Sequence, residues 1–162
     1  MKIGVISDTH IPERAQELPK ELLAGFKDVD MIIHAGDFVD LSVLEILKNI
    51  CGNVRAVYGN MDSHELKRLL PEKEVIKAGS FIIGVMHGCG PAARLPVILE
   101  ESFKGDHVDV VVFGHSHASF NEKKKGILFF NPGSPTDKIF SVYNSYGIIE
   151  INSKIEARII RL

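Results

Sequence analysis

Short apolar runs rich in β-branched residues recur along the chain up to residue 113, and amphipathic segments separate several of them. The runs are Lys2 to Ser7, Met31 to His34, Val54 to Tyr58, Phe81 to Met86 and Val108 to Phe113. Helical spacing of apolar residues is found near Pro19 to Phe26, Leu41 to Ile50 and Ala92 to Phe103. This β-α-β alternation predicts a mostly parallel sheet with helices packed on it.

The last third of the chain has a different pattern, in which tight turns separate further strand-like runs. The runs are Ile127 to Phe130, Ser141 to Tyr143, Tyr146 to Ile151 and Ile155 to Ile160. The basic stretch Lys123 to Lys125 precedes Gly126 and is typical of a hairpin tip. We therefore expect an antiparallel meander here, and two sheets with helices outside them.

The chain has 162 residues, 45% of them hydrophobic, and a formal net charge of -2. We expect one domain spanning residues 1–162, with enough apolar material for a complete core. The balanced charge lacks the basic footprint of a nucleic-acid-binding protein. No apolar run approaches the roughly 20 residues that span a bilayer, and no signal-peptide pattern precedes the first strand. Cys51 and Cys89 suggest no disulfide framework, so the cytoplasm is the expected location.

A short polar cluster with a glycine or a turn follows each of the five apolar runs. The clusters are Asp8-Thr9-His10, Gly36-Asp37, Gly59-Asn60-Met61-Asp62, His87-Gly88 and Gly114-His115-Ser116-His117. Each cluster alone has an ordinary structural explanation, such as a turn or a helix cap. Ligands of open α/β sheets bind at the carboxyl ends of strands, so five strand ends side by side would bring these groups to one place.

The polar groups form a chemically coherent set of nitrogen and oxygen donors without a thiolate. The set contains two carboxylates, four imidazoles and one amide: Asp8, Asp37, His10, His87, His115, His117 and Asn60. These donors suit Mn, Fe, Zn, Co or Ni. Seven donors exceed the four of a closed zinc site. They fit two ions about 3.5–4 Å apart if one carboxylate bridges, an arrangement that serves in-line displacement at phosphorus.

The five motifs in this order, together with Asn131-Pro132-Gly133-Ser134, resemble the calcineurin-like metallophosphoesterases. The size of the chain is similar to that of the compact bacterial and archaeal phosphodiesterases of the YfcE/MJ0936 type. The resemblance implies an α/β fold, a four-layer αββα sandwich of two mixed β-sheets flanked by helices. It also implies a metal-dependent phosphodiesterase that acts on a small phosphoester.

The same resemblance implies how the seven candidate ligands divide between two divalent ions. One ion takes Asp8, His10, Asp37 and His117, and the other takes Asp37, Asn60, His87 and His115, so that Asp37 bridges. A metal-bridging hydroxide would attack phosphorus in line, with Asn60, His87 and His115 as catalytic residues. Mn²⁺ is the expected metal, with Ni²⁺, Fe, Zn²⁺ or Co²⁺ as alternatives.

Two positions depart from the pattern of the superfamily. Many members carry a histidine after the motif asparagine that helps to protonate the leaving group, but here the residue is Met61, which has no proton to donate. The small phosphodiesterases also tend to lack this histidine. The second departure is Cys89, which stands where a second histidine is common. Cys89 either lines the pocket or serves in packing.

Other polar residues receive different interpretations. Asp62 is expected to orient the Asn60 loop through hydrogen bonds, and Asn131 is a weaker candidate for a similar role. His64 is either a substitute proton donor or simply an exposed residue in the first turn of a helix. His34, within a predicted buried strand, is expected to be a hydrogen-bonded core histidine, and we nominate neither it nor His107.

Three functions follow from these observations. The first is the phosphodiesterase, favoured because none of the seven ligands is missing. The second is a Vps29-like interaction scaffold with a vestigial metal site, and the third is a nuclease like the Mre11 branch. A homo-oligomer, dimeric or tetrameric, is left open. We expect substrate specificity to reside in the loops Ile11 to Leu18, Cys89 to Leu95 and Pro135 to Phe140.

Overall fold

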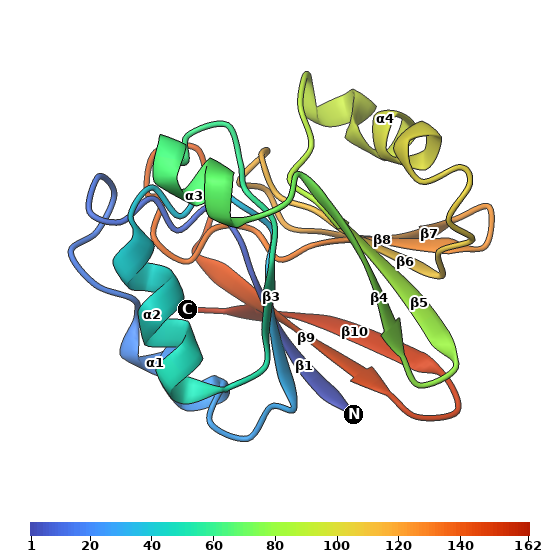
Figure 1. Cartoon of the computed structure of the whole chain (residues 1–162), viewed down its shortest axis with the longest axis horizontal. Helices are drawn as coiled ribbons and strands as arrows, with labels where there is room; N and C mark the ends of the chain where they lie inside the picture. The colour runs from blue at the N-terminus through green and yellow to red at the C-terminus, as the bar shows by residue number, and fades with distance from the viewer.

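The computed structural model describes residues 1–162 and contains two five-stranded mixed sheets packed face to face, with helices on the outer surfaces (Figure 1). The first sheet has the order β10-β9-β1-β2-β3, and its strands are β1 Lys2–Ile6, β2 Met31–His34, β3 Val54–Ala56, β9 Ser145–Ile151 and β10 Ile155–Arg161. The second has the order β4-β5-β6-β8-β7, and its strands are β4 Lys73–Ala78, β5 Phe81–Met86, β6 Val110–Val112, β7 Phe120–Lys124 and β8 Ile127–Asn131. The predicted αββα sandwich is confirmed.

Short helices cover the outer faces of the two sheets. They are α1 Lys20–Gly25, α2 Leu41–Ile50, α3 His64–Leu69 and α4 Leu95–Ser102, the last preceded by the 3-10 turn η1 Ala92–Arg94. Helix α2 shows why these segments are helical. Asp40 caps it by accepting a hydrogen bond from the backbone N–H of Ser42, and Val43, Leu44 and Leu47 turn one apolar face inward. No helix is long and apolar enough to cross a membrane.

Three apolar clusters hold the four layers together. The largest lies between the sheets, where Ile3 and Val5 of β1 contribute side chains to the same cluster as Val110 of β6. Alternate residues of a strand point to opposite faces, and Ile6 of β1 belongs instead to the cluster beneath α1 and α2 with Phe26. The third cluster packs α4 against the second sheet.

Several strand predictions are confirmed, but those for the last third need correction. The antiparallel pairs β7–β8 and β9–β10 lie in different sheets, so they do not form one meander. The segment Ser141 to Tyr143 is not a strand. The Ser141 hydroxyl donates to the carbonyl of His117 at 2.9 Å, the Tyr143 hydroxyl bonds Ser119 Oγ at 2.6 Å, and Val142 is 96% exposed. This segment is therefore held by side-chain hydrogen bonds to the loop that contains His117 and Ser119, and it does not pair with a strand through its backbone.

Two edge strands, β4 and β7, were not predicted from the sequence. β4 contains three charged and three apolar residues without a regular alternation, and β7 presents four exposed polar residues in a row. The Lys123–Lys125 stretch does end a hairpin, because Lys125 and Gly126 form the turn between β7 and β8 with φ of +50° and +90°. Both central residues of a two-residue type I′ turn require positive φ.

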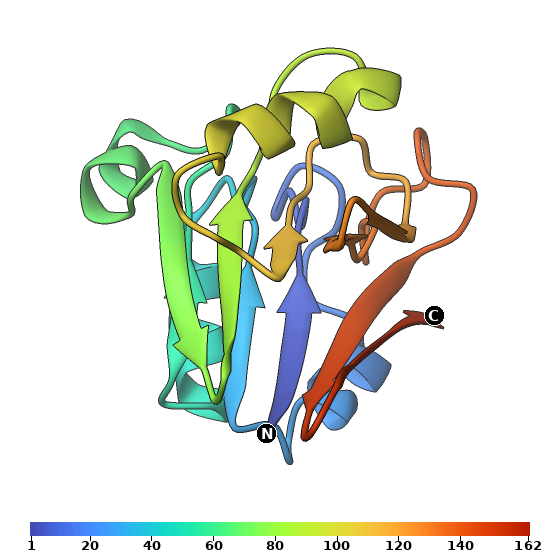
Figure 2. The ribbon, with the colours of Figure 1, turned by 90° about the vertical axis from the view of Figure 1, so that its right-hand side faces the viewer.

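The five strands that precede the polar clusters do not stand side by side in one sheet. β1, β2 and β3 belong to the first sheet, whereas β5 and β6 belong to the second. The arrows of β1, β2, β5 and β6 nevertheless point to the same end of the molecule in Figure 2. The polar clusters therefore converge from two sheets, across the interface between them.

Candidate metal centre

Four of the seven predicted ligands form one compact group at this end of the sandwich. The ligand atoms of Asp8, His10, Asp37 and His117 all lie within 4.8 Å of one another. The two Nε2 atoms of His10 and His117 are 3.2 Å apart, and Nε2 of His117 is 3.4 Å from Oδ1 of Asp8. His10 and Asp37 are almost fully buried, and Asp8 is fully buried.

The other three predicted ligands adjoin this group through Asp37. Nε2 of His87 lies 3.2 Å from Oδ2 of Asp37 and 3.1 Å from Oδ1 of Asn60. Nδ1 of His115 lies 3.0 Å from the same Asn60 oxygen. Oδ2 of Asp37 is also 3.6 Å from Nε2 of His10, so this one oxygen lies between the two groups.

These distances match the spacing of ligands around a metal ion. Bonds of about 2.1 Å at tetrahedral or octahedral angles separate two donors on one ion by about 3.0–3.4 Å. Most of the separations above fall in this range. Nδ1 of His87 donates to the carbonyl of Ala35 at 2.7 Å, which directs Nε2 toward Asn60 and Asp37. The donor set and its orientation thus fit divalent ions.

The electrostatic field of the centre favours positive charge. Burial by itself lowers the pKa of His87, but its hydrogen bond to Asp37 and the charges of Asp8 and Asp37 outweigh burial and raise the pKa to about 9. Burial raises the pKa of Asp37, yet the hydrogen bond and charge of His87 hold this pKa below its usual value. The buried carboxylates therefore stabilise a cation at this point.

Five of the seven candidate ligands adopt the left-handed backbone conformation, which residues other than glycine rarely adopt. Their φ angles are Asp8 +54°, His10 +41°, Asp37 +60°, His115 +69° and His117 +56°. Such conformations cost on the order of 1–3 kcal/mol each and cluster at functional sites. Tight approach of the loops also demands glycine: a Cβ at Gly114 would lie 2.6 Å from Oδ2 of Asp8, and one at Gly59 would overlap the Asp37 carboxylate.

Hydroxyl and amide side chains at the end of β8 and in the loop after it hold the strained loops in place. Oγ of Ser134 donates to the Asp8 carbonyl at 2.7 Å, and Oγ1 of Thr136 donates to the Thr9 carbonyl at 2.7 Å. Nδ2 of Asn131 donates to the Gly114 carbonyl at 2.8 Å. The segment after β8 thus joins the first and last polar clusters, one from each sheet.

Asp137, which the sequence reasoning did not single out, holds the ring of His117. Its fully buried carboxylate bonds Nδ1 of His117, which leaves Nε2 facing Asp8 and His10. A carboxylate behind a metal-binding histidine orients the ring and makes it a better donor. Asp137 lies in the loop Pro135 to Phe140 that the sequence marks for specificity, but no motif identifies it as a partner of His117.

We expect Asp137→Asn to weaken metal binding by about 10–100-fold, because the substitution keeps the size of the side chain but removes the anionic partner of His117. Competition with a chromophoric chelator would measure the affinity for Mn²⁺. Asp137→Glu, which restores the charge, should recover part of the loss. An unchanged affinity in Asp137→Asn would show that His117 needs no such partner.

The remaining nominated residues lie around the seven candidate ligands. Asp62 accepts hydrogen bonds from the backbone N–H groups of Gly59, Asp37 and Val39 at 2.7, 3.1 and 2.7 Å, so it ties the Asn60 loop to the Asp37 loop. Met61 is 49% exposed and lines the pocket above the centre. Cys89 is exposed and lines a smaller hollow beside His87 and Asn60.

The other three histidines are not part of the candidate ligand set. His34 is fully buried, stacks on Phe38, and bonds Oγ1 of Thr9 at 3.2 Å, as expected of a hydrogen-bonded core histidine. His64 is exposed at the start of α3, and His107 is exposed before β6. Neither of these two lines the pocket over the centre.

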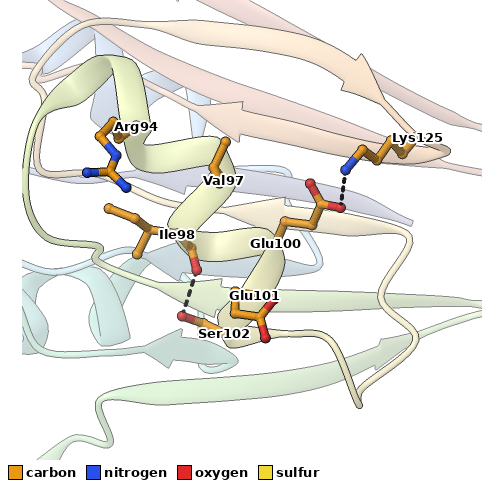
Figure 3. Close-up of a pocket in the computed structure, with 7 residues that line it drawn as sticks. All are labelled: Arg94, Val97, Ile98, Glu100, Glu101, Ser102 and Lys125. Carbon is orange, nitrogen blue, oxygen red and sulfur yellow. Dashed lines mark hydrogen bonds and ion pairs between the residues drawn. The ribbon is translucent and has the colours of Figure 1, made fainter.

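A pocket of about 350 Å³ opens over the centre. Its lining residues are His10, Glu13, Arg14, Asp37, Asn60, Met61, His115, Ser116, His117 and Phe140. A larger hollow of about 600 Å³ lies beside α4, where Lys125 pairs with Glu100 at 2.8 Å (Figure 3). No candidate ligand lines that hollow.

The chain is similar to known proteins along nearly its whole length. A family model for the calcineurin-like phosphoesterase superfamily domain matches residues 1–154. A probable metallophosphoesterase of Methanocaldococcus jannaschii, MJ0623, is 40% identical over 99% of this chain and 81% of the relative. Phosphodiesterase MJ0936 of the same organism is 32% identical over 82% and 83% of the two chains. The structure of Vacuolar Protein Sorting 29 from Cryptosporidium parvum aligns with a TM-score of 0.80 at 27% identity, over 99% of this chain and 97% of that one.

Proposed function

We propose that this chain, which belongs to the calcineurin-like phosphoesterase superfamily, is a metal-dependent phosphodiesterase that acts on a small phosphoester. The observation that carries the proposal is the pair of donor groups that meet at Oδ2 of Asp37, 3.6 Å from Nε2 of His10 and 3.2 Å from Nε2 of His87. A single carboxylate oxygen between two sets of donors suits a pair of metal ions. The 32% identity with phosphodiesterase MJ0936 supports the reaction class.

The seven side chains divide between two ions in this proposal. Asp8, His10 and His117 would hold one ion, Asn60, His87 and His115 would hold the other, and Asp37 would serve both. When bound, the ions supply an activated hydroxide for in-line attack and neutralise charge on the phosphoryl oxygens. Mn²⁺ is the first metal to test, followed by Ni²⁺, Fe²⁺, Zn²⁺ and Co²⁺.

The protein itself supplies orientation and a rigid frame. The Nδ1 hydrogen bonds of His87 to Ala35 and of His117 to Asp137 fix which ring nitrogen faces the centre. The Asp62 carboxylate holds the Asn60 loop against the Asp37 loop. Preorganised groups of this kind need little rearrangement when the transition state forms.

Proton delivery to the leaving group is the weak step of the proposed reaction. Met61 lines the pocket where a general acid would act, and a thioether has no proton to donate. A general acid typically contributes 10²–10⁴-fold to the rate. Esters with acidic leaving groups, such as nitrophenols, are therefore better substrates than alkyl esters.

The direct test is hydrolysis of bis-p-nitrophenyl phosphate by purified protein freed of metal and reloaded with Mn²⁺. We expect release of p-nitrophenol that depends on added metal and is lost on chelation. A panel of nucleotides, cyclic nucleotides and other phosphodiesters would then narrow the substrate. The absence of turnover with every metal would contradict the proposal.

The alternative functions make different predictions in the same experiments. A Vps29-like scaffold, suggested by the similarity to Vacuolar Protein Sorting 29, would gain no hydrolytic activity from added metal. Metal binding alone does not distinguish it, because a Vps29 from Entamoeba histolytica has been solved in complex with Zn²⁺. A nuclease would cleave plasmid or oligonucleotide DNA in preference to small diesters. We favour the phosphodiesterase because all seven donors are present and face one another at ligand spacing.

A further inference from the structure

Phe140 is fixed beside the candidate metal centre although it is not part of the core. Its side chain is 65% exposed, and its ring centroid lies 5.9 Å from that of His117. The chain on either side of it is anchored to His117. The Asp137 carboxylate that bonds the His117 ring also accepts the backbone N–H of Ile139 at 2.8 Å, and Oγ of Ser141 donates to the His117 carbonyl at 2.9 Å. This anchoring holds an apolar ring in solvent at the mouth of a polar pocket.

Arg14 reaches the same ring from the loop after β1. Its guanidinium carbon lies 5.4 Å from the Phe140 centroid, and its backbone N–H donates to the His10 carbonyl at 2.7 Å. No carboxylate of the protein pairs with the guanidinium, although Glu13 is its chain neighbour and lines the same pocket. An unpaired cation is therefore available to an anionic ligand.

Arg14 is thus tethered to His10, and the segment that carries Phe140 is tethered to His117. The Nε2 atoms of these two histidines face each other at 3.2 Å. We propose that Arg14 and Phe140, here called the recognition wall, select phosphoesters that carry a planar aromatic group close to phosphorus. The inference rests on the proposed phosphoesterase function. The guanidinium binds a non-bridging phosphoryl oxygen, and the Phe140 ring contacts the aromatic group of the ester.

The size and lining of the pocket favour a small aromatic ester over a polymer. Its volume of about 350 Å³ is at the lower end of the range of small-molecule sites, about 300–1,000 Å³. Met61, 49% exposed, supplies a second apolar contact on the same pocket. Contact between two aromatic rings increases affinity by about three- to tenfold, in addition to the hydrophobic contribution of the area that it buries. An aryl group and a nucleobase share this chemistry.

The test is calorimetric binding of non-hydrolysable phosphonates to the Mn²⁺-loaded full chain, with bis-p-nitrophenyl phosphate hydrolysis measured on the same samples. Phenylphosphonate should bind about three- to tenfold more tightly than methylphosphonate. Phe140→Ala should remove most of this preference, and the contact with Met61 accounts for what remains. Arg14→Gln should weaken both ligands together and leave the ratio in place. The matched control is Ile139→Ala, which removes a 68% exposed apolar side chain from the same loop but outside the pocket, and should keep the ratio.

The outcomes separate this inference from the function on which it rests. Equal binding of the two phosphonates by a protein that hydrolyses the diester would overturn the recognition wall alone. A ratio that survives Phe140→Ala would do the same. No hydrolysis and no phosphonate binding would overturn both proposals. The methylenephosphonate analogues of adenosine 5′-monophosphate and of ribose 5-phosphate distinguish the source of the ring. Tighter binding of the adenosine analogue than of the ribose analogue, lost in Phe140→Ala, identifies a nucleobase, and equal binding identifies a simple aryl group.

Discussion

Asp37→Asn is expected to lower the rate of bis-p-nitrophenyl phosphate hydrolysis by on the order of a thousandfold or more, since loss of metal charge stabilisation costs several kcal/mol. Oδ2 of Asp37 lies within 3.6 Å of both His10 and His87, so one substitution affects both groups of donors. Asparagine keeps the shape but removes the charge. An amide N–H placed toward the two imidazoles would also repel a metal ion. Metal content per chain should fall along with the rate.

The structure offers a matched control for this substitution. Asp40 is three residues away, is exposed at the start of α2, and uses its carboxylate to cap the helix by accepting from the N–H of Ser42 at 2.9 Å. Asparagine caps helices about as well as aspartate. Asp40→Asn should therefore retain activity, metal and melting temperature. If Asp37→Asn retained activity while folding normally, the shared-carboxylate centre would be wrong.

Local patterns predict much of the first half of the fold. Met31 to His34 is a strand and Leu41 to Ile50 is a helix, both with the predicted bounds. In each element the apolar residues that set the pattern are buried in one of the two large hydrophobic clusters. The edge strand β4 was missed because its apolar residues do not alternate regularly with polar ones, and β7 because four of its five residues are polar and exposed. A sheet edge is defined by its neighbour in space, which a local pattern does not contain.

The positions of the candidate ligands could be predicted, but the geometry that joins them could not. Polar clusters after apolar runs point to strand ends. The left-handed backbone at Asp8, His115 and His117 arises from contacts between distant loops. The bond from Asp137 to His117 spans 20 residues of loop and strand. In addition, β1 and β6 belong to different sheets, whereas the sequence pattern suggested neighbouring strands.

His115→Ala and His117→Ala should each remove a different ion. Nε2 of His117 faces Asp8 and His10, whereas Nδ1 of His115 faces Asn60. Plasma emission on protein dialysed against Mn²⁺ should give about two ions per chain for the unaltered protein and about one for each variant, because each loses a direct ligand. Hydrolysis should fall strongly in both, since a two-metal mechanism needs both ions.

Double variants identify which ion each histidine holds. Combining His117→Ala with His10→Ala should leave one ion, because both residues serve the same site and their effects are not additive. Combining His117→Ala with His115→Ala should leave none. His64→Ala is the control, since His64 is exposed at the start of α3 and lies outside the pocket. If the double variant of His10 and His117 lost both ions, the four histidines would belong to one shared site. The proposed division of the ligands into two groups that share Asp37 would then be wrong.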